Sequence, residues 1–245
     1  MNQISMEETV DLVTSWSGRR ESRYVCVSNV HMCMEVADNE AYGAAINRSD
    51  LTVPDGRPIY WALHLLGFKG AKQIRGEDLT LAVCAAAEEK GIPVGFFGGT
   101  PELLDQIRDV LLTRFPKLEL AILCAPPFRP ITAAENATFT ENINASGVGV
   151  LFVGLGCPKQ EDWMAAHKHS VHAVMIGVGA AFDFISGNKK SAPAWLNQIG
   201  LEWLFRLISE PRRLWKRYFL HNPRFIVRFF RQLVQHRKLT AKNDH

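Results

Sequence analysis

Short apolar runs alternate with helical patterns along this chain, and this alternation limits the folds that it can adopt. Uninterrupted apolar runs predict strands that are covered on both faces, at Tyr24–Val30, Leu51–Val53, Val94–Phe97, Leu118–Leu123, Val148–Val153 and Ala173–Val178. Helices are expected between them, at Pro58–Leu66, Leu79–Lys90, Glu102–Phe115, Ala133–Asn144 and Lys159–His167. Strands that alternate with helices form parallel sheets. The sequence therefore predicts an α/β fold in which helices flank a parallel sheet.

Charge divides the chain into two parts. Residues 188–245 contain 13 Lys and Arg against three Asp and Glu, which is a local charge of +10. The totals of 28 basic and 25 acidic residues leave a charge of −7 for residues 1–187. We therefore expect a mildly acidic body, residues 1–187, and a basic appendage, residues 188–245. Such an asymmetry indicates an anionic partner.

Aromatic residues and arginines occur together in the appendage. Asn222-Pro223 is expected to open a last helix, on which Arg224, Arg228 and Arg231 share one face. A basic, aromatic helix is typical of an anionic membrane surface, and the alternative is a core-packing helix with solvated arginines. No run reaches the roughly 18–20 apolar residues of a spanning helix, and no signal peptide is recognisable. We expect a cytoplasmic protein that lies on the inner face of the membrane.

The cysteines and histidines give no sign of a metal site. The five cysteines are odd in number and lack C-x-x-C spacing, and they are Cys26, Cys33, Cys84, Cys124 and Cys157. Several lie in apolar runs, which predicts reduced, buried thiols in a cytosolic protein. The histidines lack H-E-x-x-H or similar spacing. Neither a metal, a cofactor nor a nucleic acid is expected to bind.

Three loops follow predicted strands, where open parallel sheets bind their ligands. The first contains Asp55 beside Gly56, a carboxylate in an open turn that suits a general base, although Pro-Asp-Gly is also common in ordinary turns. The second contains Gly98 and Gly99 before a helix start, and the third contains Gly154 and Gly156. Glycines there suit either a phosphate at the helix N-terminus or a tight turn.

The third loop continues into Lys159 and Gln160, which offer a positive charge for a diphosphate and a hydrogen-bonding amide. Neither this loop nor Gly177-Val178-Gly179 has the third glycine of a dinucleotide fingerprint. NAD binding is therefore not favoured.

Long blocks of the chain resemble the WecG/TagA/CpsF family of glycosyltransferases, which transfer N-acetylmannosamine, its uronic acid or related sugars. The resemblance runs from about Tyr24 onwards and rests on Asn29 with its strand, Leu51–Trp61, Phe97–Pro101, Val153–Trp163 and Gly177–Tyr218. It implies a Rossmann-like fold and an inverting transfer, without a metal, from a UDP-sugar to a saccharide on a polyprenyl diphosphate. Such products serve cell-surface polysaccharide synthesis.

The same resemblance assigns roles to individual residues. Asp55 would be the catalytic base, with Asn29 and Gln160 in the substrate pocket. Cations of the appendage would close over the donor, and they are Arg206, Arg213, Lys216 and Arg217. Because the chain has no D-x-D pair, which many sugar transferases use to hold a metal, arginines, lysines and backbone N–H groups would stabilise the leaving group.

Two positions depart from the family pattern. Val27 stands where members often carry Thr, and Gln73 stands where they often carry Arg. Arg75, two residues further on, is a candidate to contact phosphate instead, or the change marks a different donor sugar. The donor and acceptor sugars do not follow from the sequence.

Two other classes of function fit parts of the sequence. A nucleotide-dependent oxidoreductase would suit a Rossmann-like body but not the incomplete glycine motifs. A non-catalytic peripheral membrane module would explain the basic appendage but not Asp55 and Gln160 beside glycine-rich turns. The apolar part of the appendage also suits contact with a second copy of the chain.

Overall fold

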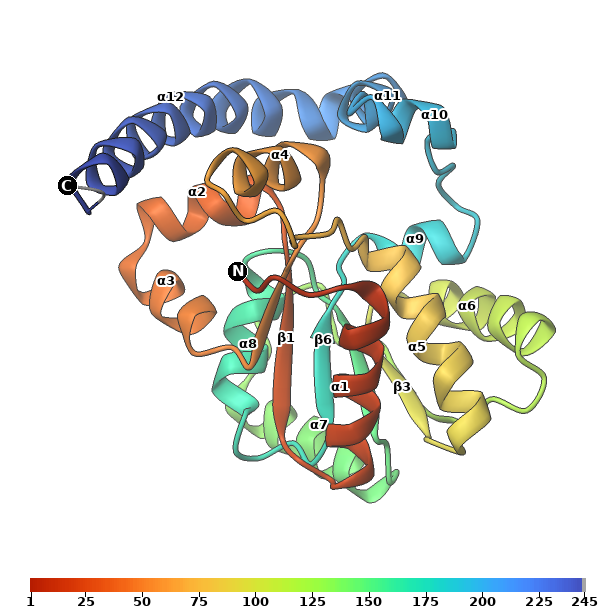
Figure 1. Ribbon diagram of the computed structural model, residues 1–245. Helices are drawn as coiled ribbons and strands as arrows, with labels where there is room; N and C mark the ends of the chain where they lie inside the picture. Colours follow the sequence, from red (N-terminus) through yellow and green to blue (C-terminus); the bar gives the residue numbers. More distant parts are fainter. Residues whose placement is uncertain (244–245) are drawn as a thin grey trace.

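The computed structural model describes residues 1–243, and side chains for all of these except residues 194, 198 and 239–243. One sheet of six parallel strands forms its centre (Figure 1). The strands are β1 (Arg23–Ser28), β2 (Leu51–Pro54), β3 (Val94–Gly98), β4 (Leu120–Cys124), β5 (Val150–Gly154) and β6 (Val174–Gly177). Their order in the sheet is β2-β1-β6-β5-β3-β4. All six predicted strands are confirmed to within two residues at each end, and so is the α/β class.

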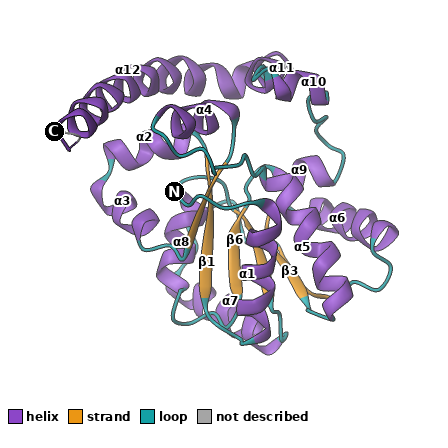
Figure 2. Cartoon of the chain, viewed as in Figure 1, coloured by secondary structure: helices purple, strands orange, loops and turns teal. Residues whose placement is uncertain are grey.

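Helices cover both faces of the sheet (Figure 2). On one face lie α1 (Met6–Gly18), α5 (Gly76–Lys90), α6 (Pro101–Arg114) and α9 (Ala181–Ile185). On the other face lie α2 (Val30–Asp38), α3 (Glu40–Asn47), α7 (Ala133–Ala145) and α8 (Lys159–His167). A further helix, α4 (Arg57–Leu65), follows β2 beyond the carboxyl edge of the sheet.

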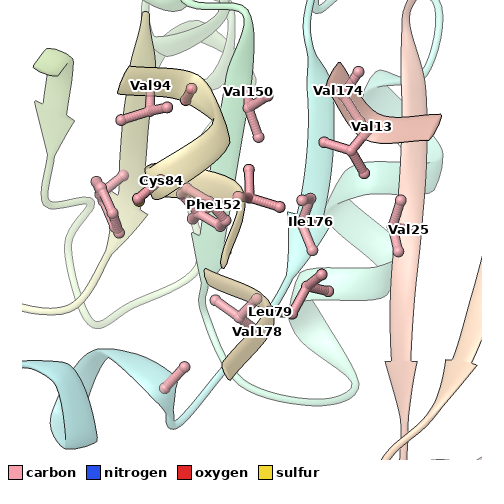
Figure 3. Close-up of a cluster of buried hydrophobic side chains, with 14 of the residues drawn as sticks. Val13, Val25, Leu79, Cys84, Val94, Val150, Phe152, Val174, Ile176 and Val178 are labelled. Atoms are coloured by element: carbon pink, nitrogen blue, oxygen red, sulfur yellow. The ribbon is translucent and has the colours of Figure 1, made fainter. Parts of the chain in front are cut away.

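Successive residues of each central strand serve opposite cores. Val25 and Ile176 face the core beneath α1 and α5, with other residues of that core drawn in Figure 3. Their neighbours Cys26 and Met175 face the core beneath α2 and α8. This alternation follows from the two-residue period of a strand. It explains why the strands read as continuous apolar runs, since both faces are buried.

Local capping explains where several helices begin. Ser5 and Glu8 form a capping box at α1, in which each side chain binds the other residue's backbone N–H. Asn29 and Asn39 cap α2 and α3 by accepting from the N–H groups of Met32 and Tyr42. These three helices were not among the sequence predictions, although each start carries a recognisable capping residue.

The basic appendage forms three helices across the carboxyl edge of the sheet (Figure 1). They are α10 (Ala194–Gln198), α11 (Glu202–Ser209) and α12 (Pro211–Asn243). The prediction that Asn222-Pro223 opens the last helix is wrong, because Pro223 lies inside α12. Proline removes one backbone hydrogen bond there. The helix continues because it packs against α2 on both sides of the proline, through His221 and Arg224.

Two kinds of polar contact join the appendage to the body. The Arg224 guanidinium lies 2.5 Å from the Asp38 carboxylate, and that of Arg228 lies 3.8 Å from it. Arg57 Nε donates to the Asn197 carbonyl at 3.0 Å. Arg224 and Arg228 therefore face the body, whereas the alternative of a core-packing helix expected its arginines to be solvated. Within residues 1–243, no helix combines the length and hydropathy needed to cross a bilayer.

Candidate active site

Two adjoining cavities lie between the carboxyl edge of the sheet and helices α11 and α12. The first, of about 310 Å³, is lined by the loops after β1, β2, β5 and β6 and by three arginines of the appendage. The second, of about 620 Å³, lies between α4 and the two appendage helices and is mostly apolar. We call them the polar cavity and the apolar cavity. Both are lined by Asn29, His31, Asp55, Arg206 and Arg217.

Asp55 is the acid at the junction of the two cavities. Its backbone N–H donates to the Ser28 carbonyl at 2.7 Å, which extends the pairing of β2 with β1 by one residue. Gly56 follows with φ of +84°, a conformation that L side chains rarely adopt, so the chain turns sharply into α4. The strand end and the turn together hold the half-buried carboxyl group at the cavity wall.

The surroundings of Asp55 raise its pKa to about 6. Burial is the main cause, and the negative charge of Glu202 adds to it. The cations Arg206 and Arg75 act in the opposite direction and lower the pKa. A carboxyl group whose pKa is close to neutral is a stronger base than an exposed one, while remaining mostly ionised at pH 7.

Gln160 belongs to a hydrogen-bonded network in the wall of the polar cavity. Its Oε1 accepts from the Gly156 N–H at 3.2 Å, and its Nε2 donates to the Glu161 carboxylate at 2.6 Å. Tyr42 donates its hydroxyl hydrogen to the other oxygen of Glu161 at 3.1 Å. The amide of Gln160 is therefore held in one orientation, which is the condition for selective hydrogen bonding to a ligand.

Glu161 is one residue of this network that could not be identified from the sequence. Its side chain is fully buried, and burial raises its pKa to about 7, against the opposing hydrogen bonds from Gln160 and Tyr42. Two acids precede Trp163 in the sequence, and only the fold shows which of them is buried. Tyr42 was also missed, because its contact with Glu161 joins helices α3 and α8.

Four arginines surround the polar cavity, and acidic side chains hold three of them. Glu202 Oε1 lies 2.7 Å from Arg206 and 3.5 Å from Arg75, so it links the appendage to the body. Glu210 lies 2.7 Å from Arg213. Arg217 Nε is buried and has no hydrogen-bond partner among residues 1–243. The wall of the polar cavity therefore combines four arginines, three of them from the appendage, with acids such as Glu77 and Glu210.

The remaining candidates from the sequence occupy different places. Gly154 and Gly156 line the polar cavity, whereas Gly98 and Gly99 line neither cavity. A Cβ on Gly98 would lie 2.6 Å from the backbone of Gly154, so this glycine permits close approach of β3 and β5. Lys159 is exposed outside both cavities.

Lys216 also lies outside both cavities, where its Nζ is 5.6 Å from the centre of the Trp215 ring. Arg75 lines the polar cavity, whereas Gln73 lines neither cavity, so a phosphate contact by Arg75 stays a prediction. All five cysteines are free thiols. Burial raises the pKa of Cys157, in the cavity wall, to about 12, so its thiol is not a nucleophile at neutral pH.

One cluster among the described residues has the side chains to hold a metal ion. His31, Glu35 and His221 place one ligand atom each within 4.8 Å of the others. Burial, followed by the charge of Arg217 and the neighbouring His221, lowers the pKa of His31 to about 4, so its ring is neutral at pH 7. Sequence spacing could not show this cluster, because it joins α2 to α12.

Comparisons with known proteins identify the family of this chain. Residues 1–239 match the model of the glycosyl transferase WecG/TagA/CpsF family. The chain is also similar to an N-acetylglucosaminyldiphosphoundecaprenol N-acetyl-beta-D-mannosaminyltransferase of Bacillus spizizenii, with 27% identity over 232 residues. That alignment covers 94% of this chain and 86% of the relative. The resemblance found in the sequence is thus confirmed, and the chain belongs to the WecG/TagA/CpsF family of glycosyltransferases.

Proposed function

We propose that this glycosyltransferase moves a sugar from a UDP-sugar to a saccharide carried on a polyprenyl diphosphate, with inversion at the anomeric carbon. The relative's name describes such a lipid-linked acceptor, and it supports a role in making precursors of cell-surface polysaccharide. One observation carries the finer proposal. Asp55, with its raised pKa, lies where an arginine-lined cavity meets an apolar one.

The polar cavity suits the donor. Arg75, Arg206, Arg213 and Arg217 present guanidinium groups, whose planar array of donors matches the oxygens of a diphosphate. Three of these arginines belong to the appendage, so the donor binds only where body and appendage meet. Gln160 and Asn29 offer amides in the same wall for the sugar or the uracil.

The reaction is a single displacement. The acceptor hydroxyl oxygen attacks the anomeric carbon while Asp55 takes the hydroxyl proton. The bond from that carbon to the β-phosphate oxygen breaks, and UDP leaves with the electron pair. The arginines stabilise the charge that develops on UDP. Attack opposite to the leaving group inverts the anomeric carbon.

The appendage suits attachment to a membrane. Apolar side chains follow one face of α12 with helical spacing and are half or more exposed, and they are Phe219, Leu220, Ile226, Val227, Phe230 and Val234. The opposite face, with His221, Arg224 and Arg228, turns to the body. An exposed apolar stripe of this kind marks an interaction surface, and the cations nearby favour anionic lipid. We place the protein on the cytoplasmic face of the membrane.

Family membership excludes both alternatives weighed from the sequence, because the family is one of glycosyl transferases. Contact with a second copy through the exposed stripe is the competing use of that surface. Sedimentation of the protein in detergent would detect it.

The proposal is tested with a panel of UDP-sugars as donors and a polyprenyl-diphosphate-linked saccharide as acceptor, with and without EDTA. UDP release that depends on both substrates is expected with at least one donor, and EDTA leaves it unchanged because arginines replace a metal. Loss of transfer in EDTA, restored by a divalent ion, would point to His31, Glu35 and His221 instead. If no donor in the panel gave UDP release, the proposed function would be refuted.

A further inference from the structure

The apolar cavity changes in character from one end to the other. Where it joins the polar cavity, its wall contains Asn29 and Asp55. The part of the wall that the polar cavity does not share contains Phe219 and Ile226, whose side chains are 70% and 53% exposed. The cavity therefore runs from the candidate base to the exposed stripe of α12. A ligand that fills it must be polar at one end and apolar at the other.

Three buried nitrogen atoms in the wall of the apolar cavity lack hydrogen-bond partners. They are His31 Nδ1, Arg217 Nε and His221 Nδ1, and none has such a partner among the side chains that the structure describes. Buried polar atoms are nearly always hydrogen-bonded in folded proteins. An unpaired guanidinium N–H beside an imidazole is a site for an anionic oxygen. The missing partner belongs to a ligand whose charged group lies at this depth in the cavity.

We propose that the apolar cavity binds the first isoprene units of the polyprenyl diphosphate acceptor. Its diphosphate lies at His221 and at Arg217, which lines both cavities and would contact the diphosphates of acceptor and donor, and its saccharide extends to Asp55. This assignment rests on the proposed function and names the place where the acceptor binds. The sequence of surfaces matches the order of groups in such a molecule, which is saccharide, diphosphate and then hydrocarbon.

The donor does not suit this cavity. A UDP-sugar is polar throughout, whereas the wall that this cavity does not share with the polar cavity is mostly apolar, with Leu207, Phe225 and Ile226 beside a few polar residues such as Arg57. Covering apolar surface with an apolar ligand lowers the free energy, because that surface is removed from water. A nucleotide sugar would provide no such stabilisation. The polar cavity, with Arg75 and Arg213, remains for the donor.

The cavity opens at the surface that we assign to the membrane. Phe219 and Ile226 belong both to the cavity wall and to the exposed stripe, whereas Val227 belongs to the stripe alone. A prenyl chain anchored in the bilayer can therefore enter the cavity without crossing water. The lipid acceptor and the membrane would then meet the protein along one continuous apolar surface.

Ile226→Asn and Val227→Asn form a matched pair that tests the assignment. The two residues are neighbours on α12, 53% and 52% exposed, and only Ile226 lines the cavity. Transfer is measured in detergent micelles with two acceptors that share one saccharide diphosphate but carry a long polyprenyl or a butyl chain. In Ile226→Asn the ratio of kcat/KM for the long to the short acceptor falls about tenfold, because a polar group replaces apolar contact. In Val227→Asn this ratio stays at its wild-type value.

An equal fall in both variants would show a general effect of the membrane-facing surface, and no fall in either would show that the cavity does not hold the chain. Each outcome would overturn the assignment. Wild-type protein that transferred no sugar to either acceptor would instead refute the proposed function itself.

A binding measurement separates the two failures without relying on catalysis. Farnesyl diphosphate is titrated calorimetrically into wild-type protein and both variants, with inorganic diphosphate as the comparison. Farnesyl diphosphate should bind wild type at least tenfold more tightly than inorganic diphosphate, and Ile226→Asn should remove most of this difference. Equal affinities in wild type would overturn the assignment. Decanoate that bound wild type as tightly as farnesyl diphosphate would also overturn the assignment, since the cavity would then accept a membrane acyl chain equally well.

Discussion

The Asp55 carboxyl group has a pKa of about 6, chiefly because it is buried. A base must be ionised to accept a proton, so kcat/KM should fall as the pH drops through 6, by about tenfold per unit below it. A pH–rate profile in which the acidic limb lies near pH 4 would contradict the role of burial. Because Glu161 also has a raised pKa, of about 7, the profile should be repeated with Glu161→Gln, in which the limb near pH 6 persists.

Burial of Asp55 also carries a cost in stability. Its pKa rises from 3.8 in the unfolded chain to about 6 in the folded chain, so stability is lost as the pH rises between these values. The asparagine in Asp55→Asn cannot ionise, so the free energy of unfolding of this variant should be about 1–3 kcal/mol higher than that of wild type at pH 7.5. The gain should shrink towards pH 4. Urea unfolding measures it, and Asp109→Asn, whose side chain is 74% exposed, should change stability by less than about 0.5 kcal/mol.

The residues of the candidate site were predictable to different degrees. Asp55, Asn29 and Gln160 follow strand ends or glycine turns, and parallel strands bring such positions to one edge. Glu202 and His221 could not be predicted, because their positions depend on how the appendage packs over that edge. Residue type and spacing along the chain contain no information about that docking angle.

The strands were the most predictable elements, because burial on both faces leaves continuous apolar runs. Helices α1, α2 and α3 were missed, although Ser5, Asn29 and Asn39 mark their starts. Pro223 misled the prediction because proline more often begins a helix than interrupts one.

Gly98, the last residue of β3, tests whether the glycines at this strand end serve the sheet or a phosphate. Gly98→Ala should lower the free energy of unfolding by about 2 kcal/mol or more, because its φ of +134° and the 2.6 Å approach to Gly154 exclude a methyl group. Gly18→Ala is the control, since nothing lies within 4 Å of the added Cβ. Thermal and urea unfolding measure both variants. A Gly98→Ala protein of normal stability with weak UDP binding would support a phosphate contact instead.

At the scale of the whole molecule, the appendage has two opposed faces. One supplies Arg206, Arg213 and Arg217 to the polar cavity, and the other exposes apolar side chains to the surroundings. The proposed membrane attachment and the closure of the cavity would therefore depend on the same helices. The charge asymmetry in the sequence predicted a surface with an anionic partner, and the structure turns part of that charge inward.

Replacing two residues of the exposed stripe should remove membrane attachment while leaving the catalytic site unchanged. Leu220 and Phe230 are each 60% exposed and line neither cavity, so the double change Leu220→Ser and Phe230→Ser should abolish sedimentation with anionic liposomes. Added salt should weaken wild-type attachment, since exposed charges are screened beyond roughly 10 Å at 0.1 M. Val110→Ser with Leu112→Ser on α6, 39% and 38% exposed, is the control. If the doubly substituted protein still sedimented with the liposomes, the exposed stripe of α12 would not be the membrane-binding surface.

The central claim is that Asp55 is the base in sugar transfer. The most direct measurement is the single-turnover rate of Asp55→Asn beside wild type at pH 7.5, with a UDP-sugar that wild type uses and a polyprenyl-diphosphate-linked acceptor. We predict a rate lower by about 10²–10⁴-fold, while UDP affinity, measured by calorimetry, stays within about threefold because the arginines are retained. A rate close to that of wild type in the folded variant would contradict the claim.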